Sequence, residues 1–398
     1  MNRRKFISTT SAALAAGAVL PGIALGANPD DRLMRHRFGL NYVPSKNWAF
    51  SWNDWKPGDI ARDFDSIAAI GADHIRMTLI WPWFQPNPII VSPAHLDRLE
   101  ELMRLANERK LDVLVTLYTG WLSGYAFKPP YLEAADFYSD PKWKPVRDLL
   151  LLEVSKRLKP HPNFLGFDLG NEINCCWKGS PTAAGDAWMD DVFKQMHDQA
   201  PDRIHVNGVD HGPFFRVDTF SPEALVAQQD IVALHCWPQW TGAKKYGSYM
   251  DTPSIQLQSA MAALARSYGN APAKPVWVQE FGLSPNPDVA DFPKWLELVV
   301  TSGIAGGVSW FTWWKSHDVE RQFQFSSEQY TRGLITVENK IKEQGFMFKR
   351  LADAYRGKAV NIPKKSPPPP PARRTDETTW QWMLDWMEWK ANNLPTRK

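Results

Sequence analysis

The chain contains few cysteines, which limits both disulfide and metal chemistry. Only Cys175, Cys176 and Cys236 occur in 398 residues, and three thiols are too few and too oddly numbered for a disulfide scaffold. No Cys-x-x-Cys or His-x-x-x-His spacing accompanies them, so we expect no metal and no cofactor. We interpret the thiols as small buried or half-buried side chains. The alternative is a thiol near a functional face, because Cys236 follows His235 and the vicinal pair follows Glu172 closely.

The chain also lacks an excess of one charge. Its formal net charge is +3 with 22% charged residues, and its one small basic group comprises Lys364, Lys365, Arg373 and Arg374. A nucleic-acid partner is therefore not expected. No Gly-x-Gly-x-x-Gly follows a predicted strand, which gives a dinucleotide-binding fold no support. The sequence does not indicate an oligomeric state.

Long hydrophobic runs are missing, apart from one near the N-terminus. Residues 2–8 read Asn-Arg-Arg-Lys-Phe-Ile-Ser and precede an uncharged stretch over 9–26 with a small-residue end. These features predict a twin-arginine-type signal peptide over 1–26, an exported protein (periplasmic or secreted), and no stable membrane insertion after signal removal. The alternative is a membrane-anchoring helix, but the run is short and rich in Ala, Ser, Thr and Gly.

Short β-rich runs alternate with longer segments of helical period over 27–360, which predicts βα units and a parallel sheet. Eight units in this order favour a single (β/α)8 TIM barrel of the α/β class. The predicted strands are 38–41, 74–79, 112–117, 164–169, 203–206, 231–234, 275–278 and 307–311. The predicted helices are 60–70, 93–109, 144–158, 186–199, 222–228, 252–268, 293–301 and 340–356.

The composition changes after the barrel. Five consecutive prolines at 367–371 predict a stiff linker over 361–375. In the Trp-rich tail 376–398, residues 379–390 are predicted to form a short helix that carries Trp382, Trp386 and Trp389 on one face. A lone helix of this length is marginal in water. We expect it to dock on its own barrel, with a partner or a polysaccharide surface as the alternative.

Two glutamates stand at the ends of predicted buried strands. Glu172 follows the apolar run 164–169, and Glu280 follows 275–278. Catalytic residues of parallel barrels converge at this end of the strands, and a pair of carboxylates is the equipment for cleaving a glycosidic bond. A separation near about 5 Å would imply retention of configuration, and a wider gap would imply inversion. The sequence therefore predicts a sugar-cleaving enzyme.

Further residues at strand ends carry a family resemblance. Asn171 precedes Glu172, Glu280 lies in Gln-Glu-Phe-Gly, Arg76 lies on the second predicted strand and His235 follows the sixth. The tryptophan cluster 310–314 and the Arg-Gly-Leu-Ile sequence at 332–335 add to the pattern. Over residues 38–355 the chain resembles the clan A retaining glycoside hydrolases, most closely glycoside hydrolase family 5, the cellulase and mannanase family.

The resemblance implies a role for each matched residue. Glu172 would be the general acid/base and Glu280 the nucleophile. Arg76 would keep Glu280 ionised, Asn171 would hold the sugar 2-hydroxyl and His235 would position Glu280 or the substrate. The bland alternatives are a structural ion pair for Arg76 and a satisfied core histidine for His235.

The sequence departs from the family pattern at two positions, after strand six and after strand three. The family usually has a tyrosine two residues after the strand-six histidine, whereas this chain has Trp237. An indole only donates a hydrogen bond and differs in reach, so the tuning of Glu280 is open at this point. Family members also often carry a histidine after strand three, where this chain has Tyr-Thr-Gly-Trp at 118–121. Tyr118 or Tyr246 is the candidate that could compensate.

Aromatic residues are abundant, with 20 tryptophans. Rings follow most predicted strand ends, and aromatic planes stack on the apolar faces of sugars. The supporting substrate-binding candidates are Asn41, Trp81, Trp121, Trp237, Trp310 and Trp313. The rings at 310–314 cannot all face the same side of a strand, so at least one is expected to pack behind the barrel.

These features together favour a β-linked oligo- or polysaccharide substrate. The predicted activity is retaining hydrolysis of the endo-β-glucanase or β-mannanase type. The alternative from another class is a non-catalytic carbohydrate-binding protein on a glycoside hydrolase barrel, which would keep the tryptophans and lose the chemistry.

Overall fold

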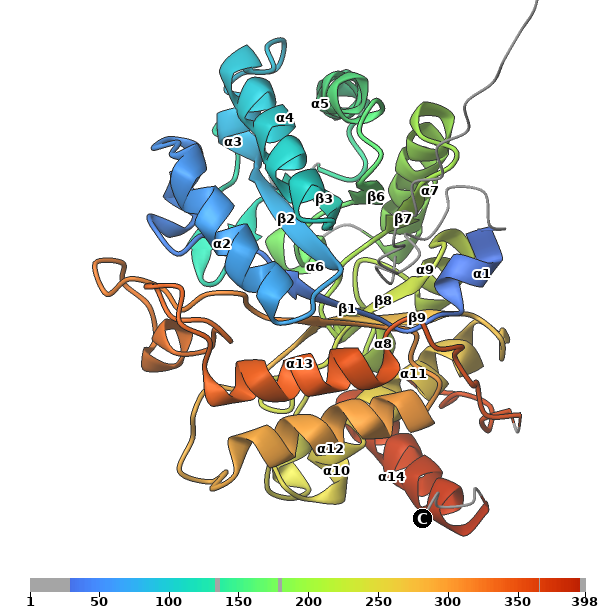
Figure 1. Ribbon diagram of the computed structural model, residues 1–398. Coiled ribbons are helices and arrows are strands. Elements are labelled where there is room, and N and C mark those ends of the chain that lie inside the picture. Colours follow the sequence, from blue (N-terminus) through green and yellow to red (C-terminus); the bar gives the residue numbers. More distant parts are fainter. Residues whose placement is uncertain (1–28, 133–136, 178–180, 365, 394–398) are drawn as a thin grey trace, which may run out of the picture.

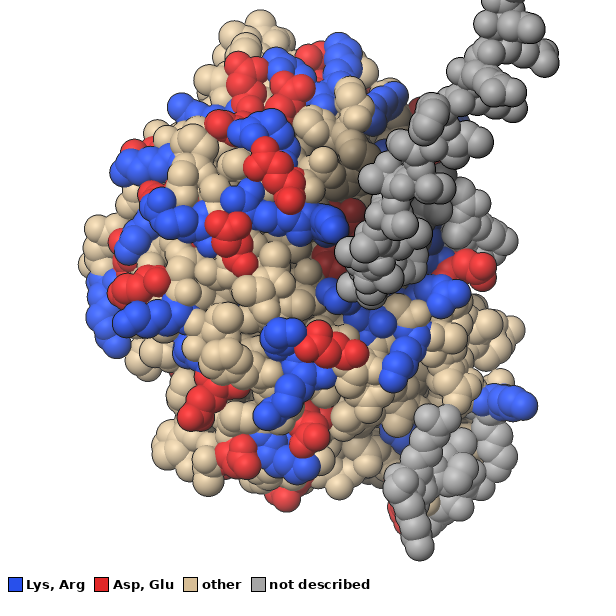
Figure 2. Space-filling model, in the orientation of Figure 1, with Lys and Arg blue, Asp and Glu red and all other residues tan. Residues whose placement is uncertain are grey.

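The computed structural model describes residues 29–132, 137–177, 181–364 and 366–393 (Figure 1). The predicted signal peptide lies outside the described residues. None of the helices in the described ranges combines the length and the apolar character needed to cross a bilayer. On the face shown in Figure 2, Lys and Arg side chains are interspersed with Asp and Glu.

Eight parallel strands form a nearly closed barrel, which confirms the predicted (β/α)8 fold. Their order around the barrel is β7-β6-β3-β2-β1-β10-β9-β8. The strands are β1 (Arg37–Asn41), β2 (His74–Ile80), β3 (Asp112–Thr119), β6 (Phe164–Asp168), β7 (Ile204–Val206), β8 (Val232–His235), β9 (Val276–Phe281) and β10 (Trp310–Trp313). Beside the remaining gap, the backbone N–H of Asp230, just before β8, donates to the carbonyl of His205 on β7 at 3.2 Å.

One long helix follows each strand and covers the outside of the barrel (Figure 1). These helices are α2 (Pro57–Ala69), α4 (Pro93–Glu108), α5 (Lys144–Leu158), α7 (Thr182–Gln199), α9 (Pro222–Gln228), α11 (Leu257–Tyr268), α12 (Phe292–Ala305) and α13 (Glu343–Tyr355). In α4, Ser92 caps the N-terminus by accepting from the backbone N–H of His95. The buried face of α4 carries Leu96, Leu99 and Leu102, at the spacing of one helix face.

The last strand begins later than the sequence predicts. Residues 306–308 are used to end α12, where the N–H of Val308 donates to Gly303 and Gly307 adopts a left-handed φ of 74°. The chain therefore becomes extended only after this turn. As a result Trp310 lies at the start of β10, in register with Arg37 and Trp277, and not near its end as the predicted strand 307–311 implied.

The C-terminal tail forms α14 (Asp376–Asn393), which packs on the outside of the barrel against α11 and two short helices, α8 (Gly212–Phe215) and α10 (Thr252–Ile255). Its buried side chains include Trp380, Trp382, Met383, Trp386 and Met387. Trp380 Nε1 donates to the carbonyl of Thr241 at 2.6 Å, and Trp382 Nε1 donates to that of Pro369 at 2.8 Å. Both indole N–H groups are thus satisfied inside the chain.

Candidate active site

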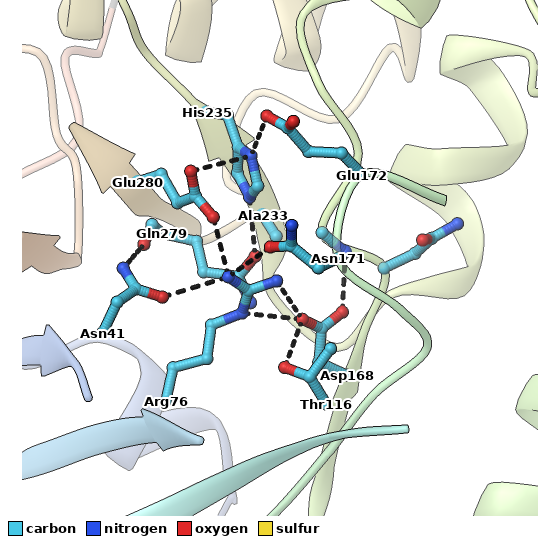
Figure 3. A network of polar contacts seen from close by, with 12 residues as sticks. Asn41, Arg76, Thr116, Asp168, Asn171, Glu172, Ala233, His235, Gln279 and Glu280 are labelled. Atoms are coloured by element: carbon cyan, nitrogen blue, oxygen red, sulfur yellow. Dashed lines mark hydrogen bonds and ion pairs between the residues drawn. The ribbon is translucent and has the colours of Figure 1, made fainter. Parts of the chain in front are cut away.

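The polar residues singled out in the sequence meet at the carboxyl ends of the strands (Figure 3). Arg76 comes from β2, His235 from β8 and Glu280 from β9, while Asn171 and Glu172 follow β6. Parallel strands point the same way, so residues far apart in sequence arrive at one end of the barrel.

Arg76 is the centre of this network. Its Nη1 lies 2.8 Å from Glu280 Oε1 and 3.0 Å from both Asn41 Oδ1 and Asn171 Oδ1. Its Nε donates to Asp168 Oδ2 at 2.8 Å. The guanidinium is fully buried, and burial of a charge is tolerated when opposite charges and hydrogen bonds accompany it. The two carboxylates supply both.

Asp168 is a site residue that the sequence analysis did not single out. Besides Arg76, it accepts from Thr116 Oγ1 at 3.0 Å and from the backbone N–H of Gly208 at 2.7 Å. A Cβ at Gly208 would lie 2.4 Å from Gln279 Oε1, so the close approach of the backbone requires glycine. The available signal was a carboxylate within the otherwise apolar run 164–169.

Glu280 receives hydrogen bonds on both carboxylate oxygens. Arg76 donates to Oε1, and Trp237 Nε1 donates to Oε2 at 3.3 Å. His235 Nδ1 lies 3.4 Å from the same Oε2. Burial raises the pKa of Glu280 above its ordinary value, whereas His235 and Arg76 act to lower it. The ionised form of Glu280 is therefore supported by donors on both oxygens.

Glu172 has a different environment. It has a left-handed φ of 45° just before the short helix α6 (Ile173–Cys176), and its side chain is 18% exposed. His235 Nδ1 lies 2.9 Å from Oε1. Burial raises the pKa of Glu172 to about 8, and the negative charge of Asp210 adds to the effect. Asp210, also not singled out in the sequence, accepts from Asn174 Nδ2 at 2.6 Å.

His235 lies between the two glutamates (Figure 3). Its Nε2 is 3.1 Å from Gln279 Oε1, and burial lowers the pKa of the imidazole. One side-chain oxygen of Glu172, one of Glu280 and a ring nitrogen of His235 all lie within 4.8 Å of one another. Three such atoms have the spacing of metal ligands, but the fixed charge of Arg76 on Glu280 opposes a cation there.

The predicted supporting residues divide into two groups. Asn41 contacts Arg76, Trp237 contacts Glu280, and the carbonyl of Trp121 accepts from Asn171 Nδ2 at 3.1 Å. The Trp121 ring is 37% exposed. These three lie at the site.

The predictions that Trp81, Trp310 and Trp313 offer rings to a substrate are wrong, because all three are at most 1% exposed. Trp81 packs in an aromatic cluster with Tyr118 and donates to Gln85. Trp310 lies among the barrel-interior residues, beneath Arg37. Trp313 packs between the barrel and the outer helices, against Phe281 and Trp295.

Neither tyrosine takes the place of the family's tyrosine. Tyr118 is buried and donates to the carbonyl of Arg147, and Tyr246 stacks on Trp380. Trp237 itself supplies the donor to Glu280. Cys176 and Cys236 are buried and Cys175 is half-buried, as expected, and the backbone N–H of Cys236 donates to the carbonyl of Glu280 at 2.7 Å.

Six aromatic residues, Trp48, Phe50, Tyr125, Phe127, Phe323 and Phe325, form a cluster that we call the aromatic wall. They come from the loops after β1, β3 and β10. The ring centroid of Trp48 lies 4.8 Å from that of Tyr125 and 4.9 Å from that of Phe325. Tyr125 Oη donates to the carbonyl of Gln324 at 3.0 Å. The wall thus joins three loops above one side of the barrel.

The aromatic wall stands beside the catalytic candidates. The hairpin that carries Tyr125 begins at Trp121, whose carbonyl is bonded to Asn171. Between Trp48, Leu122 and Trp314 the remaining cavity measures about 20 Å³, which is room for about one water and not for a sugar ring. On the other side, after β8, Trp240 is 50% exposed. The two sides of the site thus differ, with packed rings after β1, β3 and β10 and an exposed ring after β8.

The family model for cellulase (glycosyl hydrolase family 5) matches residues 38–318. The comparison with curated proteins found no match.

Three solved structures are among those with a similar fold. A variant of GH5_18 from Streptomyces cattleya in complex with Manβ1-4GlcNAc is 27% identical, with a TM-score of 0.80 over 89% of this chain and 92% of that chain. A GH5_18 variant from Bifidobacterium longum subsp. longum, also in complex with Manβ1-4GlcNAc, is 26% identical, with a TM-score of 0.76 over 83% and 81%. An exo-β-1,4-mannosidase from Opitutaceae bacterium strain TAV5 is 21% identical, with a TM-score of 0.77 over 89% and 68%, and shows likeness of fold alone.

Proposed function

This chain belongs to glycosyl hydrolase family 5, and from that premise we propose that it releases terminal β-linked mannosyl residues from short glycans by a retaining mechanism. The chain is thus a glycoside hydrolase. The observation that supports the retaining mechanism most directly is the spacing of two carboxylates. One oxygen of Glu172 and one of Glu280 lie within 4.8 Å of each other. Retaining glycosidases hold their two carboxyl groups about 5 Å apart.

The environments of the two glutamates support different roles. Glu172, with a pKa of about 8, holds a proton at neutral pH and donates it to the departing glycosidic oxygen. Glu280, held by Arg76 and Trp237, attacks the anomeric carbon and forms the glycosyl ester. Glu172, now ionised, then takes a proton from the water that cleaves this ester. Asn171 donates one amide N–H to Trp121, and its other N–H is available to a sugar hydroxyl.

Two observations support a terminal mannosyl unit as the group released. The rings of the aromatic wall pack against one another beside the site, and the space next to Trp48 holds about one water, which favours a glycan that extends from the reacting bond in one direction only. Both GH5_18 relatives at 26–27% identity were solved with Manβ1-4GlcNAc. We therefore propose removal of single mannosyl units in place of the endo action expected from the sequence.

A product analysis tests this function. We expect Manβ1-4GlcNAc and short β-1,4-mannooligosaccharides to release mannose, with the β anomer appearing first in a proton NMR time course. Rapid loss of viscosity from a mannan solution would contradict single-unit release, and an α anomer appearing first would contradict retention. Quenching of tryptophan fluorescence by these sugars without any product would favour the non-catalytic binding protein.

We also propose that the protein is exported by the twin-arginine route, on the basis of the arginine pair at residues 3 and 4 and the uncharged stretch that follows. Replacement of both arginines by lysine should leave the chain in the cytoplasmic fraction of a twin-arginine-competent host. Equal export of the two forms would contradict the proposal.

A further inference from the structure

Arg332 is a buried arginine that the proposed chemistry does not use. It lies between the 3₁₀ helix Ser327–Tyr330 and α13, and its side chain is 1% exposed. Its guanidinium carbon lies 5.0 Å from the ring centroid of Trp237 and 5.4 Å from that of Trp240. A guanidinium over an indole is attracted to the ring, most strongly where water is excluded. Arg332 therefore covers the residue that donates to Glu280.

The position of Arg332 is fixed from several directions. Its Nε donates to Ser284 Oγ at 3.2 Å, and that hydroxyl donates to the carbonyl of Glu328 at 2.6 Å. The Arg332 carbonyl accepts from Trp313 Nε1 at 3.0 Å. These contacts tie the residue to the loop after β9 and to β10. The guanidinium is thus held in place before any substrate arrives.

The charge of Arg332 is only weakly compensated. Its single ion pair among the described residues is with Glu328 at 3.5 Å, and that carboxylate is 61% exposed. Its Nη1 is buried and has no hydrogen-bond partner within the part of the chain that the structure describes. Burial lowers the pKa of Arg332 to about 10, which leaves it charged at neutral pH. Arg76, by contrast, is paired with two carboxylates.

Trp237 connects this charge to the reacting carboxylate. Its Nε1 donates to Glu280 Oε2 at 3.3 Å, and its ring lies 4.7 Å from Trp240 and close to the backbone at Gly282. An indole N–H donates along one direction in the ring plane, so a small rotation of the ring would break the bond to Glu280. What holds the ring therefore decides whether that bond is made.

We propose that Arg332 is a positioning residue for Glu280: it holds the Trp237 ring so that the indole N–H donates to Glu280, and it places a positive charge behind that ring. The inference rests on the proposed role of Glu280 as nucleophile and goes beyond it, because Arg332 lies outside the reacting groups. It also explains how an indole replaces the tyrosine that the family pattern has at this position.

The titratable groups near Arg332 show whether its charge raises or lowers the pKa of Glu280. Glu328, Tyr249 and Glu280 favour its charged form, and burial together with the charge of Arg332 lowers the pKa of Lys315. By the same interaction, the charge of Arg332 favours the ionised form of Glu280. Removal of that charge should raise the pKa of Glu280.

His235, Arg76 and Glu172 also act on Glu280, and they are unchanged in variants at position 332. The acidic limb of the pH profile is the range in which kcat/KM falls as Glu280 becomes protonated. A shift of this limb would therefore report on Arg332 itself. A purely structural arginine would change stability or the amount of active enzyme, and it would leave the limb in place.

The test compares Arg332→Met, which keeps much of the bulk without the charge, with Arg332→Lys, which keeps the charge without the planar stack. For Arg332→Met we expect the acidic limb of kcat/KM to move to higher pH by about 0.5 to 1 unit. We expect kcat to fall about tenfold with little change in KM, because the affected group reacts and does not bind. For Arg332→Lys we expect a lower kcat and a smaller shift of the limb than in Arg332→Met, because the charge is kept and the planar stack is lost.

Arg374→Met is the matched control. Arg374 also lies over an aromatic ring, with its guanidinium carbon 5.9 Å from the Tyr268 centroid, and it pairs with Glu223 at 3.8 Å away from the site. This variant should keep the wild-type pH profile. If Arg332→Met does not fold, Arg332→Gln supplies the same loss of charge.

The outcomes separate this inference from the proposed function. A wild-type enzyme that turns over β-mannosides, with an unchanged acidic limb in the folded neutral variants, would overturn the role of Arg332 alone. A limb that moves equally in Arg332→Lys would also overturn it, because the charge is still present. A wild-type chain that cleaves no β-glycoside would overturn the proposed function and this inference together.

Discussion

Glu172 and Glu280 have the same side chain, and their neighbours make them chemically different. Glu280 receives donors on both oxygens, from Arg76 and Trp237. Glu172 lies 2.9 Å from His235, and burial, together with the negative charge of Asp210, raises its pKa to about 8. Burial raises the pKa of both carboxyls, and among the described residues only Glu280 has an arginine donor that favours its ionised form, which suits one group to act as acid and the other as nucleophile.

The raised pKa of Glu172 predicts the alkaline limb of the pH profile. Because the acid acts in its protonated form, kcat/KM of the wild type should fall as pH rises through about 8. In Glu172→Gln this limb should disappear. Hydrolysis of mannosides with poor leaving groups should fall about 10³-fold, while activated aryl mannosides should be relatively spared. The measurement is kcat/KM against pH for both substrate types.

Asp210→Asn provides the companion variant. Its lost negative charge should lower the pKa of Glu172, so the alkaline limb should move to lower pH with the acid still present. An alkaline limb that persists in Glu172→Gln would assign the proton donor to another group.

At the scale of the elements, the loops after β1, β3 and β10 are the ones that we expect to close one end of the substrate cleft. Each loop contributes rings to the aromatic wall, and Tyr125 ties the hairpin after β3 to Gln324 in the loop after β10. Aromatic rings bury large areas with little rotational freedom. A short set of loops can therefore close one end of the cleft firmly.

Opening the aromatic wall should change the products. Tyr125→Ala removes a ring 4.8 Å from Trp48 and the bonds to Gln324. The wild type should release only mannose from mannotetraose, whereas the variant should also release mannobiose because a second sugar finds room. Phe346→Ala, an exposed ring on α13 outside the wall, is the control. Identical product patterns from all three proteins would refute the wall as the determinant of single-unit release.

The helix α14 should contribute to the stability of the barrel. Trp380 is buried, stacks with Tyr246 and donates to the Thr241 carbonyl. Trp380→Ala should lower the free energy of unfolding by about 3 to 5 kcal/mol. The exposed Gln381→Ala, next to it on the same helix, should change it by less than about 0.5 kcal/mol. Denaturant unfolding compares the two, and equal values would show that α14 contributes little.

At the scale of the whole molecule, the barrel was readable from the sequence because its signals are local. Buried parallel strands are short apolar runs, and the helices between them show one apolar face. The glutamates stood out because a carboxylate directly after a buried strand is costly without a purpose. The contact of Arg76 with Glu280 followed from the family pattern, whereas its bond to Asn171 was not predicted.

Features that depend on long-range packing were not readable. Asp168 and Asp210 act on the site through partners from other strands and loops, and the one local signal was the position of Asp168 within an apolar run. The burial of Trp81 and Trp310 is decided by neighbours distant in sequence. For Trp310 the late start of β10, caused by the turn that ends α12, moved the ring from the expected rim into the interior.

The most direct test of the account is to trap the sugar on the enzyme. A 2-deoxy-2-fluoro-β-mannosyl fluoride should form a long-lived ester, because the fluorine slows both steps and the good leaving group restores the first. Peptide mass spectrometry of the inactivated wild type should then locate one mannosyl adduct on Glu280. An adduct on Glu172, or rapid turnover of natural mannosides with inversion and no adduct, would contradict the assignment of Glu280 as nucleophile.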